Sequence, residues 1–160
     1  MGVSGLPALV LTVSDGVTAG TRQDRSGEAV ESVLSNAGFE VERKVVPDER
    51  DEIASVLRTA SESFRLVATT GGTGFGPRDV TPEATLEVIE REAPGMGQLM
   101  IARGLESTEM AALSRLRVGS RGECLIVNLP GSPKGATESL QAIVGLIPHV
   151  CDLLAGDTHH

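Results

Sequence analysis

A glycine-rich stretch with two charged residues follows an apolar run of the chain. Its members in chain order are Gly71, Gly72, Thr73, Gly74, Phe75, Gly76, Pro77, Arg78 and Asp79. Glycine lacks a Cβ atom, so the backbone can approach a ligand closely, and free N–H groups at a helix N-terminus attract anions. Thr81 and Pro82 are the predicted N-cap and first position of the helix that follows. Together these features predict a cradle for phosphate groups.

The glycine-rich stretch does not match a standard nucleotide-binding motif. It lacks the Gly-Lys-Ser/Thr ending of the P-loop, and no dinucleotide fingerprint with a suitably placed acidic residue follows. A purely structural turn is therefore the alternative interpretation. Arg78 is either an anion-binding cation or a solvated loop residue, and Phe75 either covers a ligand ring or packs on its own loop.

Two aspartates, Asp48 and Asp79, each come shortly after a predicted strand and lie in loops. Two carboxylates beside a phosphate cradle would coordinate Mg²⁺, because this hard ion prefers oxygen ligands and leaves positions open for phosphates. Both residues also have a structural interpretation. Aspartate after proline is common in turns, and Asp79 can cap the helix that begins near Thr81.

Hydrophobic periodicity predicts the elements that position these residues. Apolar runs predict strands at residues 9–13, 39–46, 66–70 and 123–128. Helical spacing predicts helices over 26–38, over about 53–64, over 82–92, in two shorter pieces within 95–117, over about 133–146 and over 148–156. This alternation is typical of an α/β fold, in which a mainly parallel sheet has helices on both faces in three layers. We expect one domain over residues 1–160, with its core at about 7–155.

In parallel sheets, ligands bind beyond the carboxyl ends of the strands. The loops at that edge are predicted to be 14–26, 47–49, 71–81 and 129–134. The first and last of them add further candidates for ligand binding, namely Ser14, Asp15, Gly131, Ser132, Pro133 and Lys134. Ser14 and Asp15 either hold a ligand or cap a turn. Lys134 opposes the dipole of its helix, which favours an anion contact.

Composition excludes several classes of partner. The formal net charge is −8, and the chain has no Trp or Tyr, so neither a basic stripe nor the usual base-stacking platform for nucleic acid is expected. No apolar run reaches the length of about 20 residues that a membrane helix needs, and no signal-peptide pattern is seen. We therefore expect a cytoplasmic protein that binds neither nucleic acid nor membranes.

The cysteines and histidines are not arranged for metal binding. Cys124 and Cys151 each lie within an apolar run, which predicts two buried free thiols. The three histidines, His149, His159 and His160, form no zinc-binding pattern. His149 is expected to be a packing or surface residue.

Four motifs of the chain resemble those of the molybdenum-cofactor biosynthesis proteins of the molybdopterin adenylyltransferase (MogA and MoaB) type. The resemblance covers about residues 7–155. The motifs are Ser14-Asp15 after the first strand, Thr70-Gly71-Gly72-Thr73-Gly74, the run from Pro77 to Thr85 (PRDVTPEAT), and the run from Asn128 to Gly135 (NLPGSPKG). The resemblance implies a molybdopterin-binding, MogA-like α/β fold.

The resemblance also implies an activity, which is the Mg·ATP-dependent transfer of AMP to the terminal phosphate of molybdopterin with release of pyrophosphate. It implies a homotrimer and a separate metal-insertion enzyme. By resemblance, Asp48 and Asp79 are the essential acidic, metal-binding positions. The loop Gly71–Gly74 is the nucleotide cradle, and Gly131-Ser132-Pro133 is part of the pterin pocket.

The nucleophile of such a reaction is a phosphate oxygen of the substrate, so no covalent catalytic residue is needed, and the chain offers no catalytic triad. Two alternatives of other classes stay open. One is a carrier that holds molybdopterin or a related pterin phosphate without turnover, and the other is an interaction module of the same fold.

Overall fold

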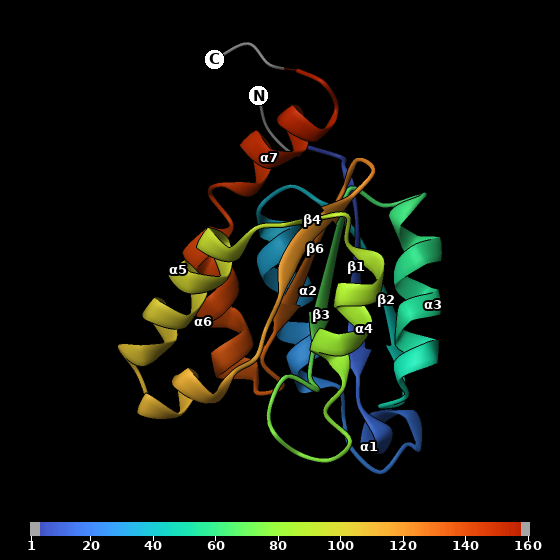
Figure 1. Cartoon of the computed structure of the whole chain (residues 1–160), viewed down its shortest axis with the longest axis vertical. Helices are drawn as coiled ribbons and strands as arrows, with labels where there is room; N and C mark the ends of the chain where they lie inside the picture. Colours follow the sequence, from blue (N-terminus) through green and yellow to red (C-terminus); the bar gives the residue numbers. More distant parts are fainter. Residues whose placement is uncertain (1–3, 158–160) are drawn as a thin grey trace.

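The computed structural model describes residues 4–157, in which a six-stranded mixed sheet lies between two layers of helices (Figure 1). The strands are β1 (Pro7–Val13), β2 (Glu40–Val46), β3 (Leu66–Thr70), β4 (Arg91–Glu92), β5 (Val118–Arg121) and β6 (Cys124–Leu129). Their order across the sheet is β2-β1-β3-β6-β5-β4. Strands β2, β1, β3 and β6 are parallel, whereas β5 and β4 are antiparallel to their neighbours.

Helices cover both faces of this sheet (Figure 1). The larger core cluster contains side chains of α2 (Arg25–Asn36), α5 (Pro94–Leu105), α6 (Pro133–Ile143) and α7 (Ile147–Leu154). The cluster on the other face contains side chains of α3 (Arg50–Ser61) and α4 (Thr81–Val88). Two shorter elements complete the described chain, namely α1 (Asp15–Thr18) and the 3₁₀-helix η1 (Glu109–Leu113). The predicted three-layer α/β fold is thus confirmed.

The central strands are buried along nearly their whole length, because helices shield them on both sides. All residues of β3 and β6 are buried, as are the last six of β1. Such continuous apolar runs are typical of parallel strands. Strand β2 is an edge strand, and its charged residues are largely exposed. Within residues 4–157, no helix is long and apolar enough to cross a membrane.

The register of the parallel strands brings their carboxyl ends together. Val13 of β1 pairs with Val46 of β2, and Thr70 of β3 pairs with Leu129 of β6. The loops after these four strands therefore start side by side at one edge of the sheet, as the sequence predicted.

One predicted helix is too long, and two strands, β4 and β5, were not predicted. The helix expected over 82–92 ends at Val88, and Arg91–Glu92 instead forms β4, which pairs with β5. Strand β5 turns back on β6 through Gly122, whose φ of 56° suits a tight hairpin. These short strands are set by pairing at the sheet edge and have no strong pattern of their own.

The predicted N-cap of α4 is also wrong. Val80 occupies that position, and Thr81 is a fully buried residue of the first turn whose hydroxyl donates to the carbonyl of Gly71 at 2.9 Å. A tertiary hydrogen bond thus replaces the local cap. Helices α5 and η1 correspond to the two short helices expected within 95–117. His149 is exposed, while His159 and His160 lie outside the described residues.

Candidate active site at the carboxyl edge of the sheet

The loops after the parallel strands enclose a cavity of about 670 Å³. Of the residues that the sequence singled out, those in its wall are Ser14, Asp48, Gly71, Gly72, Asp79, Gly131, Ser132 and Pro133. Asp15, Thr73, Gly74, Arg78 and Lys134 are not part of the wall. Each of the four predicted loops therefore contributes at least one candidate residue to the cavity.

Asp48 is fixed by a reciprocal contact with Asp15. The Asp15 amide donates to Asp48 Oδ2 at 2.9 Å, and the Asp48 amide donates to Asp15 Oδ1 at 3.0 Å. Ser14 accepts a hydrogen bond from the Val17 amide and caps the short helix α1, which starts at Asp15. Turn capping is therefore confirmed for Ser14. The Asp15 carboxylate instead binds the Asp48 loop, and a ligand contact of either residue stays a prediction.

Asp79 holds its own loop. Its Oδ2 atom accepts a hydrogen bond from the Gly76 amide at 2.9 Å, and its amide donates to the Gly76 carbonyl at 3.0 Å. Among residues 4–157, neither Asp79 Oδ1 nor Asp48 Oδ1 accepts a hydrogen bond. Each carboxylate therefore keeps one oxygen for a ligand.

The electrostatics of this acidic end disfavour the charged form of Asp48. Burial raises the pKa of the Asp48 carboxyl, and the nearby charges of Asp15 and Asp79 raise it further. The Asp15 amide and Arg78 act in the opposite direction. For Asp15 itself, the hydrogen bonds from Arg78 and from the Asp48 amide lower the pKa. Asp48 and Asp79 thus lie near enough to repel each other, as a cation site requires.

Arg78 acts as a clamp between loops. It donates two hydrogen bonds of 3.1 Å to Asp15 and one of 3.0 Å to Glu49. These two carboxylates raise its pKa. Because its guanidinium is engaged with Asp15 and Glu49 and lies outside the cavity wall, Arg78 holds the loop that positions Asp48.

The glycines of the cradle are required by packing against other loops. Gly71 and Gly72 have φ values of 104° and 73°, in the region that favours glycine. A Cβ on Gly71 would collide with the Val13 carbonyl, and one on Gly72 would collide with the Thr81 hydroxyl. On Gly72, that Cβ would also lie 3.2 Å from Asp48 Oδ1. The absence of side chains here lets two loops and the Asp48 carboxylate converge.

Arg115 is a residue of this region that sequence analysis missed. Its guanidinium donates to the carbonyls of Gly74 at 2.8 Å and Asp79 at 2.9 Å, and it pairs with Glu83 at 2.6 Å. The same guanidinium lies over the exposed Phe75 ring, with 5.4 Å between its central carbon and the ring centroid. Arg115 thereby fixes the loop that bears Asp79. It lies 36 residues from Asp79, and no local pattern marks it.

The loop before α6 also contributes to the wall of the cavity. Ser132 is the N-cap of this helix and accepts a hydrogen bond from the Gly135 amide at 3.1 Å. Gly131 packs against Gly71, so this loop and the glycine-rich loop lie in contact. Lys134 is exposed in the first turn of α6.

Several wall residues come from the end of β1, the start of α2 and the segment between them, and sequence analysis did not select them. They are Thr12, Val17, Arg22, Gln23, Arg25 and Ser26. Two arginines beside a predicted helix start were the available signal. The wall is therefore acidic at Asp48 and Asp79 and basic at Arg22 and Arg25.

The donor set fits a hard divalent ion whose remaining ligands come from phosphate. Asp48 and Asp79 offer carboxylate oxygens, which Mg²⁺ prefers. Within the described part of the chain, no group of three or more His, Cys, Asp or Glu residues is placed to hold a metal. Cys124 and Cys151 are buried free thiols, and burial raises the pKa of Cys124 to about 12.

Comparisons with known proteins place this geometry in a family context. The family described as "probable molybdopterin binding domain" matches residues 9–149. The molybdopterin adenylyltransferase of Helicobacter pylori strain J99 is 42% identical over 153 residues, which covers 92% of this chain and 87% of that protein. The crystal structure of the molybdopterin biosynthesis enzyme MoaB from Thermus thermophilus superposes with a TM-score of 0.88 at 49% identity, over 94% of this chain and 97% of that one.

A longer relative contains this domain as one part. The molybdenum cofactor synthesis protein cinnamon of Drosophila melanogaster is 41% identical over 152 residues, and the match spans 92% of this chain but only 25% of that protein.

Proposed function

The chain belongs to the molybdopterin-binding domain family, and from that premise we propose that it adenylylates molybdopterin, with ATP as the donor. A bond forms between an oxygen of the terminal phosphate of molybdopterin and the α-phosphorus of ATP. The bond from that phosphorus to the bridging oxygen of the β-phosphate breaks, and its electron pair leaves with pyrophosphate. The observation that carries the proposal is the meeting of Asp48, Asp79, Gly72 and Ser132 in one cavity.

The chain contributes position and charge to this reaction. The cavity wall, as far as residues 4–157 form it, contains no cysteine, histidine or lysine. A phosphate oxygen is already a competent nucleophile, so catalysis rests on alignment and on charge neutralisation. We assign the nucleotide to the side of Gly71 and Gly72, and the pterin to the side of Gly131, Ser132 and Pro133.

We further propose that Asp48 and Asp79 hold Mg²⁺ through their Oδ1 oxygens. The ion, when bound, neutralises charge on the phosphates of ATP and on departing pyrophosphate. Asp15 and Arg78 support this site indirectly, because they fix the loop of Asp48. Ser14 lines the wall directly. The carbonyls of Thr73 and Gly74 accept hydrogen bonds from Arg115, which fixes the glycine-rich loop.

We propose a homotrimer as the assembly, with a separate enzyme that inserts the metal into the adenylylated product. Support for self-association comes from large apolar side chains exposed on α5 and η1, namely Leu99, Leu105, Met110 and Leu113. The two elements contact each other, and exposed apolar side chains gathered on neighbouring elements favour an interaction site. The cytoplasmic location expected from the sequence stays a prediction.

The test is to incubate the purified chain with molybdopterin and ATP labelled at the α-phosphate, with Mg²⁺ or with a chelator. We expect label in a product whose mass equals molybdopterin plus an adenylyl group, together with one pyrophosphate per product. Molybdopterin that binds but stays unmodified, with no pyrophosphate, would contradict the enzyme and favour the carrier.

A further inference from the structure

The cavity wall has a basic end, formed by Arg22 and Arg25, to which the proposed reaction assigns no role. Arg22 and Arg25 lie in the wall and flank the N-terminus of α2, a helix of 12 residues. Within residues 4–157, neither side chain has an ion pair or a hydrogen bond with protein. In a chain of net charge −8, most other arginines are paired with carboxylates or carbonyls, so two unpaired arginines in one cavity are unusual.

A mostly buried serine with an unpaired hydroxyl lies at the same place. Ser26 is the second residue of α2, is only 8% exposed and lines the cavity. Its hydroxyl has no hydrogen-bond partner among the described residues, although its oxygen is not sealed from the cavity. Because Ser26 lines the cavity and no protein group uses its hydroxyl, this hydroxyl can donate a hydrogen bond to an acceptor bound there.

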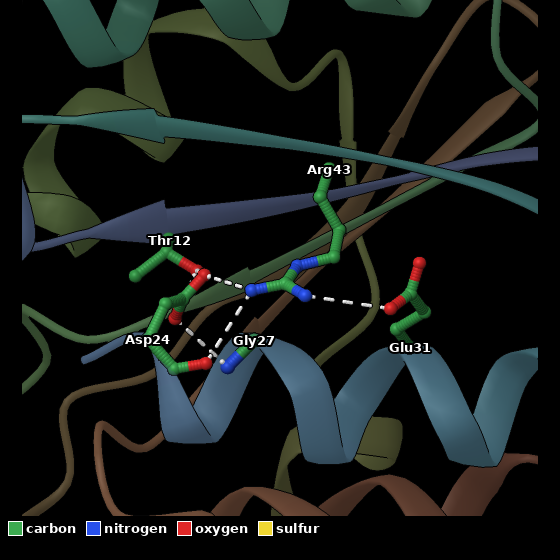
Figure 2. A network of polar contacts seen from close by, with 5 residues as sticks. All are labelled: Thr12, Asp24, Gly27, Glu31 and Arg43. Carbon is green, nitrogen blue, oxygen red and sulfur yellow. Dashed lines mark hydrogen bonds and ion pairs between the residues drawn. The ribbon is translucent and has the colours of Figure 1, made fainter.

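The charge of the nearest carboxylate is already compensated. Figure 2 shows Asp24, the N-cap of α2, turned inward among three donors. Thr12 Oγ1 lies 2.9 Å from it, the Gly27 amide 3.0 Å and Arg43 Nη2 2.7 Å. Arg43 also pairs with Glu31 at 3.4 Å (Figure 2). Arg43 and Thr12 compensate the negative charge of Asp24. This N-cap carboxylate therefore repels an anion at the N-terminus of α2 only weakly.

The hydrogen bonds that Asp24 accepts from Thr12, Gly27 and Arg43 also fix the segment around Asp24. Asp24 ties its segment to β1 through Thr12 and to β2 through Arg43 (Figure 2). Arg22 and Arg25, on either side of Asp24 in the sequence, both line the cavity. Gly16 leaves room for the stem of Arg22, since a Cβ there would lie only 2.6 Å from Arg22 Cδ. Arg22 and Arg25 are exposed side chains, and the contacts of Asp24 and the space left by Gly16 fix the segment that carries them.

We propose that Arg22, Arg25 and Ser26 form a binding subsite for a phosphate monoester, and that its occupant in the reaction is the terminal phosphate of the acceptor. The identity of the occupant rests on the proposed function, whereas the binding of a phosphate group does not. Guanidinium groups and a helix N-terminus both favour a doubly charged phosphate. Asp48 and Asp79 lie elsewhere in the wall and repel phosphate that carries no metal ion. The acceptor phosphate would therefore bind at the arginines, and the phosphates of ATP would bind with Mg²⁺ at the two aspartates.

The first experiment measures binding of inorganic phosphate by calorimetry, with a chelator present so that no metal site contributes. We expect Arg25→Gln to weaken phosphate binding about tenfold, because a hydrogen bond between charged groups is lost. Ser26→Ala should weaken it by a few-fold, and Gly16→Ala should weaken it by displacing Arg22. Arg91→Gln is the matched control, since Arg91 is an exposed arginine of β4 outside the cavity.

The outcome that overturns the subsite is an affinity of the Arg22→Gln/Arg25→Gln variant within twofold of the parent. The thermal midpoint of each variant is recorded, so that a loss of fold is recognised. Gly16→Ala keeps both arginines and thus tests their placement separately from their charge.

The second experiment identifies the occupant through steady-state kinetics. We expect Arg25→Gln to raise KM for molybdopterin about tenfold while KM for ATP stays unchanged. A rise for ATP alone would overturn the acceptor assignment and give the subsite to the nucleotide. If the parent chain shows no turnover, the proposed function fails, and the phosphate titration still decides whether the subsite exists.

Discussion

Asp15 and Asp48 exchange hydrogen bonds, each main-chain amide donating to the carboxylate of the other residue at 2.9 and 3.0 Å. The contact joins the loop after β1 to the loop after β2. It uses Oδ2 of Asp48 and leaves Oδ1 for the cavity. Arg78 braces the other side of Asp15, so the orientation of Asp48 depends on three loops at once.

Asp48→Asn is expected to stabilise the chain at neutral pH while it lowers activity. The folded-state pKa of Asp48 is raised, so its protonated form favours the folded state below the unfolded pKa, and this contribution is lost as pH rises through the folded pKa. At pH 7 the ionised carboxylate therefore costs stability. Asparagine keeps the acceptor for the Asp15 amide without that charge. We expect a thermal midpoint about 1–3 °C higher in the presence of a chelator.

The control for this variant is the pH dependence of the same midpoint. The difference between parent and variant should shrink as pH falls toward about 3, where the parent carboxyl is protonated too. A variant that is less stable at pH 7, or a difference independent of pH, would contradict the assigned cost of the charge.

Asp79→Asn should lower turnover roughly a hundredfold or more, because it removes one carboxylate from the site proposed for Mg²⁺. The amide side chain can still accept the hydrogen bond of Gly76, so the loop should keep its shape. Pyrophosphate release measures turnover, and Asp51→Asn, an exposed residue of α3, removes the same charge elsewhere. Near-parental turnover in Asp79→Asn would remove Asp79 from the site.

Gly72→Ala is expected to destabilise the chain by roughly 2–4 kcal/mol, because the added Cβ meets the Thr81 hydroxyl in a left-handed backbone conformation. The main effect of the substitution is therefore expected on the free energy of unfolding. Denaturant unfolding measures it, with Gly95→Ala as the control, since a Cβ at Gly95 has no neighbour within 4 Å. Equal stability of the two variants would contradict the packing seen at Gly72.

The chain is expected to scatter light as a trimer at micromolar concentration. Met110 and Leu113 of η1, which are 62% and 48% exposed in the single chain, would be buried between subunits. Met110→Glu with Leu113→Glu should then lower the measured mass to that of one chain. A monomer mass for the parent would remove both the trimer and this interpretation of α5 and η1.

The fold was predictable from sequence where burial repeats along an element. The strands β1, β3 and β6 are continuous apolar runs, and α2 and α3 carry apolar residues at helical spacing. Strands β4 and β5 were not predictable. Strand β4 consists of two exposed residues, and β4 and β5 form by pairing with each other at the sheet edge. Thr81 looked like an N-cap, but a buried hydrogen bond to Gly71 determines its place.

The candidate site was predictable where its residues directly follow strands. Asp48 and Gly71 belong to such loops, and the register of the parallel strands brings the loops together. Arg115 could not be found this way, since it reaches the Asp79 loop from a distant segment and its role is visible only in its contacts. Arg22 and Arg25 were not considered from the sequence, and their shared place in the cavity wall is visible only in the structure.

The central claim is that Asp48 and Asp79 bind ATP only through a divalent ion. The most direct test is the dissociation constant of ATP, measured by calorimetry with Mg²⁺ and with a chelator, for the parent and for Asp48→Asn/Asp79→Asn. For the parent, we expect Mg²⁺ to tighten binding at least about tenfold, because the carboxylates repel bare phosphates and attract the Mg²⁺ complex. The double variant should lose most of this dependence. Equal ATP affinity of the parent with and without Mg²⁺ would contradict the two-carboxylate site.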